Sequence, residues 1–356
     1  MTKVAVVGFG VIGQRLADAV AAQGDMELVG IADLAPSISL RALVERGMPY
    51  DLYCAIAGKE AALTDAGIPV TGPLEELVQK VDIILDATSP GVGAKNKELY
   101  EKYNKKAIFQ GGEKNDIVDV FFHGYANYEN GVDADFLKLT SCNTTGLIRT
   151  IHWLDQAVGV EKAAITIIRR VADPGDTFRG LTNNLMIEAV PNHQAVDLMT
   201  IMPHIDCTGV LVHTPVTHGH IISVVAKTKK DISVDQAIDL FKTHPRMKVV
   251  KIADGFDSNG AFFRYARDRG NMRSDMYEVG IWEECVAKSG DDLIFSINIP
   301  QEAITIPETI DGIRAATGMQ SDGKEAVALT NKYLDLITPN QSSTCLNYHP
   351  LMMASF

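Results

Sequence analysis

The first 140 residues alternate short apolar runs with stretches of helical periodicity. The apolar runs are residues 4–7, 26–31, 81–85 and 107–109, and the helical stretches are residues 14–23, 74–80 and 93–103. Continuous β-branched runs are typical of parallel strands buried on both faces, and such strands are joined by crossover helices. The pattern therefore predicts an α/β fold with a Rossmann-type, doubly wound parallel sheet over residues 1–140.

The pattern changes after residue 140. Longer runs rich in Val, Ile and Thr cover residues 163–171, 208–216 and 220–228, and a helical stretch covers residues 234–242. Strands that are poorly interleaved with helices favour a mostly antiparallel sheet. We therefore expect a second domain, of the α+β class, at residues 141–302.

Helical periodicity returns over residues 307–336, with Pro307 near the start and Glu308, Asp311 and Arg314 at polar positions. Pro is favoured in the first turn of a helix because its missing N–H has no intrahelical partner there. We expect residues 303–338 to form a helical segment that packs back on the first domain. The tail at residues 339–356 shows no usable periodicity.

Composition fits an ordinary globular protein of 356 residues, with 46% apolar and 22% charged residues. The formal charge is −12, from 33 Lys and Arg against 45 Asp and Glu. A net negative charge of this size repels phosphate backbones and anionic bilayers, which argues against nucleic acid or membrane as a primary partner. Anionic ligands would have to be held by helix N-termini and single arginines.

The five cysteines are odd in number, dispersed, and free of CxxC or other metal-ligand spacing. We therefore expect a reduced, cytoplasmic protein without a metal. No apolar run reaches the roughly 18 residues that a membrane span requires, and the apolar start of the chain lacks a signal-peptide cleavage site. Neither export nor anchoring is expected.

The segment Gly8-Phe9-Gly10-Val11-Ile12-Gly13 follows an apolar strand and opens a helix. In that context GxGxxG predicts a dinucleotide site: Gly8, Gly10 and Gly13 allow the turn, the approach of pyrophosphate and close packing of helix on strand. Asp33 stands twenty residues after Gly13, where a carboxylate accepts hydrogen bonds from ribose hydroxyls and favours NAD. Arg41 lies nearby and leaves NADP possible.

A thiol lies at the start of a second helix. Cys142 follows the strand-like residues 136–139 and precedes the helical residues 147–155. The positive end of a helix lowers a cysteine pKa from about 8.5 into a range of roughly 3.5 to 7.5. Cys142 is therefore the candidate nucleophile, whereas Cys54, Cys207 and Cys285 stand among apolar neighbours as small buried hydrophobes.

A nucleophilic thiol needs a base, and three of the nine histidines fall in one strand-rich stretch: His213, His218 and His220. His218 and His220 are two residues apart and should share one strand face. Their pattern does not distinguish which of them is the base. A metal fragment is the alternative, although no third ligand accompanies them at a suggestive spacing.

Several motifs occur in one order along the chain. They are Gly8 to Gly13, Asp-Ala-Thr at 86–88, Gly-Ala-Lys-Asn-Lys at 93–97, Phe-Gln-Gly-Gly-Glu-Lys at 109–114, Ser-Cys-Asn-Thr-Thr-Gly-Leu at 141–147, Arg-Arg-Val-Ala-Asp-Pro at 169–174, Gly-Phe-Asp-Ser at 255–258 and Pro-Glu-Thr-Ile-Asp at 307–311. Together they closely resemble the archaeal-type (type II) phosphorylating glyceraldehyde-3-phosphate dehydrogenases. The resemblance runs from about Val4 to about Leu336.

The resemblance implies oxidation of glyceraldehyde 3-phosphate with NAD(P) and inorganic phosphate, through a cysteine thioester, by a homotetramer. It makes residues 141–302 the catalytic domain, with Cys142 the nucleophile and His218 the catalytic histidine. Cofactor-contacting positions fall on Val11, Ile12, Gly112, Arg170 and Gln301, and substrate-contacting positions on Ser141, Asn143, His193 and Gln194.

The chain departs from the usual family pattern at three places. Asn192-His193-Gln194 replaces Ser-His-His, which removes one possible cationic donor to phosphate. Asp33-Leu34 replaces Lys-Thr, which strengthens the case for NAD. Pro300 and Ala303 replace His and Ser beside Gln301.

Two other functions share part of this pattern. Semialdehyde dehydrogenases and acyl-phosphate reductases of amino-acid synthesis run similar thioester chemistry on a Rossmann domain. A non-catalytic NAD(H)-binding redox sensor would use Cys142 as an oxidation switch. The enzyme is favoured because one segment carries the nucleophile, the helix start and flanking polar groups together.

Overall fold

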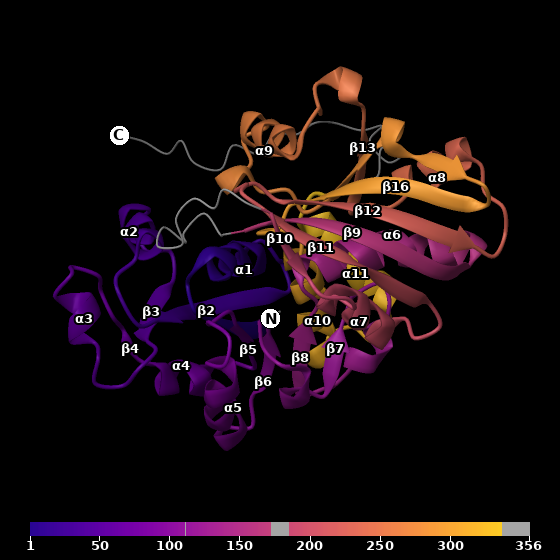
Figure 1. The fold of residues 1–356 in the computed structure, drawn as a ribbon. Helices are drawn as coiled ribbons and strands as arrows, with labels where there is room; N and C mark the ends of the chain where they lie inside the picture. Colours follow the sequence, from indigo (N-terminus) through magenta and orange to yellow (C-terminus); the bar gives the residue numbers. More distant parts are fainter. Residues whose placement is uncertain (111, 172–184, 337–356) are drawn as a thin grey trace.

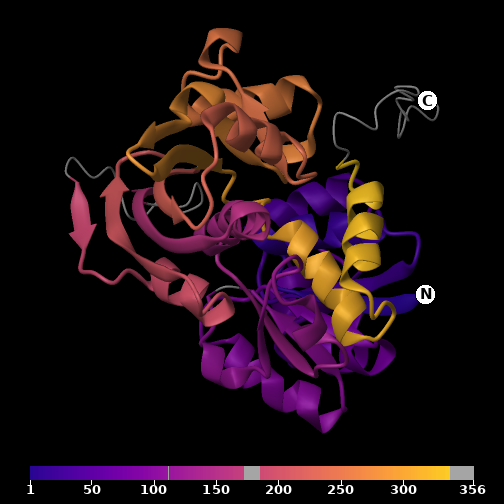
Figure 2. The ribbon, with the colours of Figure 1, turned by 90° about the vertical axis from the view of Figure 1, so that its right-hand side faces the viewer.

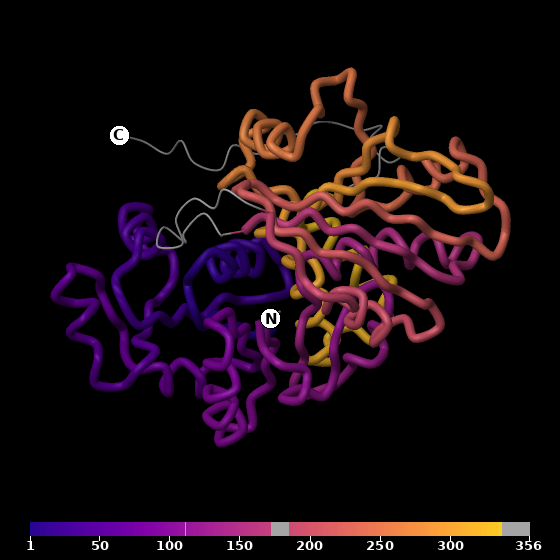
Figure 3. The backbone as a smooth tube through the Cα atoms, viewed as in Figure 1, coloured from indigo at the N-terminus to yellow at the C-terminus, as the bar shows by residue number. Residues whose placement is uncertain are grey.

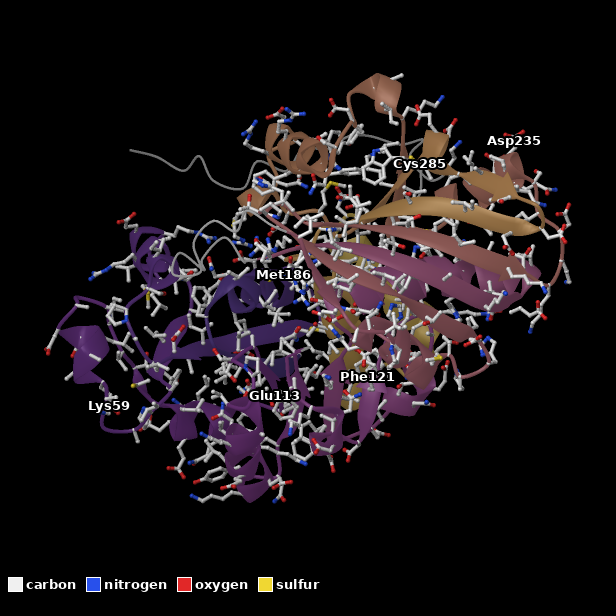
Figure 4. The ribbon with its side chains drawn as sticks, in the orientation of Figure 1. Lys59, Glu113, Phe121, Met186, Asp235 and Cys285 are labelled. Atoms are coloured by element: carbon white, nitrogen blue, oxygen red, sulfur yellow. The ribbon has the colours of Figure 1, made fainter. Side chains whose placement is uncertain are left out.

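The computed structural model describes residues 1–110, 112–171 and 185–336. The chain forms two sheet-based units, and its C-terminal helices return to the first (Figure 3). Lys59, in the first unit, and Asp235, in the second, lie near opposite ends of the molecule (Figure 4). In the described part of the chain, no helix is long and apolar enough to cross a membrane.

The first unit is a parallel sheet in the order β4-β3-β2-β1-β5-β6-β8-β7 (Figure 1). Its strands are β1 (Thr2–Val7), β2 (Met26–Asp33), β3 (Asp51–Cys54), β4 (Gly72–Pro73), β5 (Ile83–Asp86), β6 (Lys106–Phe109), β7 (Val120–Phe122) and β8 (Phe136–Leu139), and its helices are α1 (Val11–Ala21), α2 (Ile38–Glu45), α3 (Ala61–Thr64), α4 (Leu74–Lys80) and α5 (Gly93–Lys102). The predicted parallel sheet is confirmed.

Alternation along β1 builds a core on each face of this sheet. Val4 and Val6 pack with α1 on one face, and Ala5 and Val7 pack with α4 and α5 on the other. Successive strand residues point to opposite faces, so a run that is apolar throughout requires cover on both sides. This explains why the apolar runs predicted strands so well.

The second unit is a mixed sheet in the order β10-β11-β9-β12-β16-β14-β13, with β15 beside β16. Its strands are β9 (Val160–Arg170), β10 (Met186–Glu188), β11 (Asp206–Thr214), β12 (His220–Thr228), β13 (Met247–Val250), β14 (Val279–Trp282), β15 (Ala287–Ser289) and β16 (Asp292–Ile299). Among its described pairs, β11–β9 and β13–β14 are parallel and the others antiparallel. The mostly antiparallel second sheet is confirmed.

Helices cover one face of the second sheet more fully than the other. The core beneath that face joins β9 and β12 to α6 (Cys142–Val158), α7 (His193–Ile201) and α8 (Val234–Lys242). On the other face, α9 (Asn259–Asp268) packs near β13 and β14 in a small aromatic cluster. Short 3-10 helices are η1 (Asn115–Ile117), η2 (Tyr128–Gly131), η4 (Ile252–Asp254), η5 (Met272–Ser274) and η6 (Glu283–Cys285).

The helical stretch near the C-terminus is two helices, α10 (Ile306–Ala316) and α11 (Gly323–Tyr333). Gly318, with φ of +66°, lies between them, and this left-handed conformation ends the first helix. Ile306, Ile310 and Ile313 join the core on the α1 face of the first sheet. Figure 2 shows both helices, in yellow, beside the first unit. The division of the chain at residues 140, 302 and 338 stays a prediction.

The polar residues of α10 are buried rather than solvated. Glu308 bonds to Arg149 of α6 at 2.6 and 2.8 Å and to Arg246 at 3.0 Å, and Arg246 also bonds to Asp311 at 2.7 Å; all four side chains are fully buried. Burial alone would raise the pKa of Glu308, but the two arginines hold it below its ordinary value. This cluster ties the helix of the candidate nucleophile to α10.

Removing one charge from this cluster should destabilise the protein. Glu308→Gln leaves two buried arginines short of a counter-charge, and breaking a buried pair typically costs about 3–5 kcal/mol. Denaturant unfolding followed by circular dichroism measures the effect. Glu101→Gln, which removes an exposed pair with Lys97, is the control, and equal shifts for the two variants would contradict the expectation.

Candidate active site

The turn between β1 and α1 has the geometry of a pyrophosphate site. Gly8 has φ of +87°, and a Cβ there would lie 2.9 Å from the backbone of Ala87. A Cβ on Gly13 would lie 1.8 Å from the carbonyl oxygen of Gly8, whereas Gly10 faces open space. The first N–H groups of α1, from Val11 and Ile12, have no intrahelical partner and can face an anion. These residues fit a dinucleotide.

Asp33, at the end of β2, lies beside this turn. Its Oδ2 accepts the N–H of Phe9 at 2.9 Å and its Oδ1 accepts the N–H of Leu34 at 2.7 Å. The Arg41 guanidinium donates to the carbonyl of Ala66 and is therefore engaged away from Asp33. A fixed carboxylate without a free arginine is the arrangement that suits a ribose hydroxyl.

Cys142 is the first residue of α6, a helix of 17 residues. Ser141 is the N-cap, and its Oγ accepts the N–H of Thr144 at 3.3 Å. Cys142 is partly exposed, whereas Cys54 and Cys207 are buried, and burial raises the pKa of Cys207 to about 12. Cys345 lies outside the described residues. Among the described cysteines, Cys142 combines access with a helix N-terminus.

The histidine in contact with Cys142 is His220, not His218. The Sγ of Cys142 and the Nε2 of His220 are 3.7 Å apart. His218 is exposed, bonds to the Thr217 hydroxyl at 2.8 Å and packs edge-on against Phe263. Strand β12 begins only at His220, and Gly219, with φ of +61°, turns the chain just before it. The spacing of the two histidines had suggested that they share a strand face, and the structure shows that they do not.

His220 is a neutral, oriented side chain. Burial, reinforced by Arg170 and Arg169, lowers its pKa well below the ordinary value. Its Nδ1 accepts the backbone N–H of Arg170 at 3.1 Å. The ring proton of the neutral form is therefore on Nε2, facing the sulfur, where it can stabilise a thiolate or a later oxyanion.

Two helix N-termini meet beside Cys142. Helix α7 begins at His193 behind the N-cap Asn192, and Thr144 of α6 donates to Asp197 of α7 at 3.5 Å. Asn143 and Gln194 are each 1% exposed, and their side-chain oxygens have no hydrogen-bond partner among the described residues. Buried amides of this kind are available to a ligand.

Comparison with known proteins identifies the lineage of the chain. A profile of the glyceraldehyde 3-phosphate dehydrogenase C-terminal domain matches residues 141–261, and one of the dihydrodipicolinate reductase N-terminus matches residues 2–112. The chain is 38% identical to a glyceraldehyde-3-phosphate dehydrogenase of Methanobacterium bryantii over 95% of its length and all of the relative, and 35% identical to that of Methanothermobacter thermautotrophicus over the same shares. The chain belongs to the glyceraldehyde-3-phosphate dehydrogenase family.

Enzymes of this family bind phosphorylated ligands, so a positive charge near the helix starts is of interest. Lys138 supplies such a charge, and it was not among the candidate site residues predicted from the sequence. Lys138 of β8 is nearly buried, and its Nζ donates to Asn115 at 2.6 Å. Burial lowers its pKa, and Asp197 and Glu113 act in the opposite direction. The sequence feature that could have identified Lys138 is its position inside an otherwise apolar strand, where a lysine is unusual.

His193, whose side chain is exposed at the start of α7, completes this group. Partial desolvation lowers its pKa, Asp197 raises it, and the cations Arg169 and Lys138 lower it. The ring is therefore held largely neutral, so it serves a phosphate better as a hydrogen-bond donor than as a charge.

Two of the remaining positions that the family resemblance assigns to the cofactor lie at a cavity of about 360 Å³. Arg170 and Gln301 line it together with His218, Arg15 and Glu302. A Cβ on Gly112 would lie 2.9 Å from Pro90, so this glycine permits close packing of two loops. Arg170 pairs with Glu302 at 3.2 Å.

The contact between His220 and Cys142 predicts thiol reactivity. His220→Ala should slow carbamidomethylation of Cys142 by iodoacetamide at pH 7 by about tenfold or more, because a hydrogen bond to a charged acceptor contributes about 1.5–3 kcal/mol. Mass spectrometry of the modified peptide gives the rate. His218→Ala is the matched control and should react like the parent; a larger effect at His218 would restore the original assignment.

Proposed function

We propose that this chain oxidises glyceraldehyde 3-phosphate, with NAD and inorganic phosphate, to 1,3-bisphosphoglycerate. The observation that carries the proposal is a partly exposed thiol at the start of a long helix, 3.7 Å from the Nε2 of a buried histidine. The names of its close relatives support the same substrate.

Residues from both units would hold the coenzyme. Gly8, Gly10 and Gly13, with the first N–H groups of α1, suit the pyrophosphate, and Asp33 suits the adenosine ribose. Arg170, Gln301, Val11, Ile12 and Gly112 are offered as further contacts on the strength of the family resemblance. When bound, the nicotinamide accepts the hydride from the substrate aldehyde carbon.

The thiolate of Cys142 attacks the aldehyde carbon, and its electron pair forms the C–S bond while the carbonyl oxygen becomes an alkoxide. The Nε2–H of His220 then donates to that oxygen and stabilises its charge. When the hydride leaves, the alkoxide collapses to a thioester. A phosphate oxygen attacks the thioester carbon, the C–S bond breaks, and the thiolate is regenerated with the acyl phosphate.

Phosphate must be bound against the net charge of −12. The N-termini of α6 and α7 supply N–H donors and positive potential. Ser141, Asn143, His193 and Gln194 stand at these two helix starts. Lys138 offers a buried positive charge on the same side, which can compensate for glutamine at position 194.

The surface of the second sheet supports the proposed homotetramer. On the face opposite α6 and α7, Ile168 of β9 is 39% exposed, and at the sheet edge Met186 and Ile187 of β10 are also exposed. Figure 4 labels Met186. Apolar side chains gathered on a sheet surface are typical of subunit interfaces. We also propose a cytoplasmic location, in keeping with the odd number and wide dispersion of the five cysteines.

The reaction is tested by NADH formation at 340 nm with glyceraldehyde 3-phosphate, with and without inorganic phosphate. Turnover should require phosphate, and Cys142→Ala should abolish it because no thioester can form. Aspartate semialdehyde serves as the competing substrate. A variant without the thiol that keeps most of its rate would end the covalent mechanism, and NADH binding without any turnover would favour the redox sensor.

Asp33 should set the preference for NAD. Asp33→Ala removes the acceptor for the ribose hydroxyls and the charge that repels a 2′-phosphate, so the ratio of kcat/KM for NAD to that for NADP should fall by about tenfold or more. Steady-state kinetics with both coenzymes measure it. Equal use of the two by the parent protein would contradict this role.

A further inference from the structure

Glu302 joins three elements that surround the coenzyme positions. It follows Gln301 directly, lies after strand β16, and its side chain is 22% exposed. One carboxylate oxygen accepts from Arg15 of α1 at 2.7 Å, and the other accepts from Arg170 of β9 at 3.2 Å. A single carboxylate thus bridges the first unit and the second.

Each arginine also donates a hydrogen bond to a backbone carbonyl of a neighbouring segment. Arg15 donates to the carbonyl of Val11 at 2.6 Å, in the first turn of α1. Arg170 donates to the carbonyl of Thr217 at 3.0 Å, in the loop before His220. Glu302 is therefore two contacts away from the first turn of the dinucleotide helix and two from the loop that leads to His220.

Burial makes these contacts rigid. The side chains of Arg15 and Arg170 are each 4% exposed, and Asp275 is a second partner of Arg15 at 2.7 Å. Buried guanidinium groups are costly without counter-charges and hydrogen bonds, so they keep their partners in fixed geometry. Arg15, Arg170, Gln301 and Glu302 all line the same cavity.

We propose that Glu302 is a positioning residue for the coenzyme: through Arg15 and Arg170 it sets the α1 turn, the end of β9 and Gln301 in one binding arrangement. The inference rests on the proposed function, because it takes these positions to contact NAD(H). Charge alone predicts the reverse effect, since removing a carboxylate beside an anionic ligand would strengthen binding. The sign of the change therefore separates positioning from simple repulsion.

The test is NADH binding by the full-length protein, followed by fluorescence, together with the iodoacetamide rate at Cys142. Glu302→Gln should raise the Kd for NADH by about tenfold or more, while the alkylation rate stays within about twofold of the parent. KM for NAD should rise more than kcat falls. Glu302→Asp, which keeps the charge but shortens its reach, should recover part of the affinity.

The control is Glu161→Gln, which breaks an exposed ion pair with Lys227 at the opposite end of β9. An unchanged or tighter Kd in Glu302→Gln would overturn the proposal, and so would a parallel loss of alkylation rate and NADH affinity, because that is the mark of a general structural defect. Failure of the parent protein itself to bind NADH would instead remove the proposed function.

Discussion

The structure depends on a buried ion cluster that joins α6 to α10. Arg149 stands two turns after Cys142 on α6, and with Arg246 it meets Glu308 and Asp311 of α10. A buried charge is strongly destabilising unless it stays paired, so these four side chains can move little relative to one another. Because α10 also packs into the core of the first sheet, the cluster links the helix that begins at Cys142 to the sheet that carries the glycine turn.

Local electrostatics prevail over the net charge at the active site. The enzyme carries −12 overall, yet the starts of α1, α6 and α7 and the buried Lys138 present positive potential where anions are expected. Such sources act over a few ångströms, whereas the distributed surface charge is screened within about 8–10 Å at physiological salt. A strongly acidic protein can in this way handle phosphorylated ligands.

Much of the site follows from signals that are local in sequence. The GxGxxG turn, the carboxylate of Asp33 and the helix start at Cys142 each depend on residues within one strand and one helix, so periodicity and spacing predicted where these residues lie. The expectation that His218 and His220 share a strand face was wrong, because Gly219 adopts a positive φ and β12 begins one residue later, which places His220 rather than His218 beside Cys142. A period-2 rule holds only inside a strand, and the sequence did not reveal where this strand starts.

The sequence by itself determined the two sheets, the glycine turn after β1 and the position of Cys142 at the start of a helix, because each depends on the order of apolar and polar residues along a short stretch. Only the tertiary structure decided which polar residues are buried. Glu308 and Asp311 follow a polar helical pattern, and Arg15 and Glu302 stand far apart in the chain. Their roles depend on which charges meet when separate elements pack, and that pairing is a property of three-dimensional proximity.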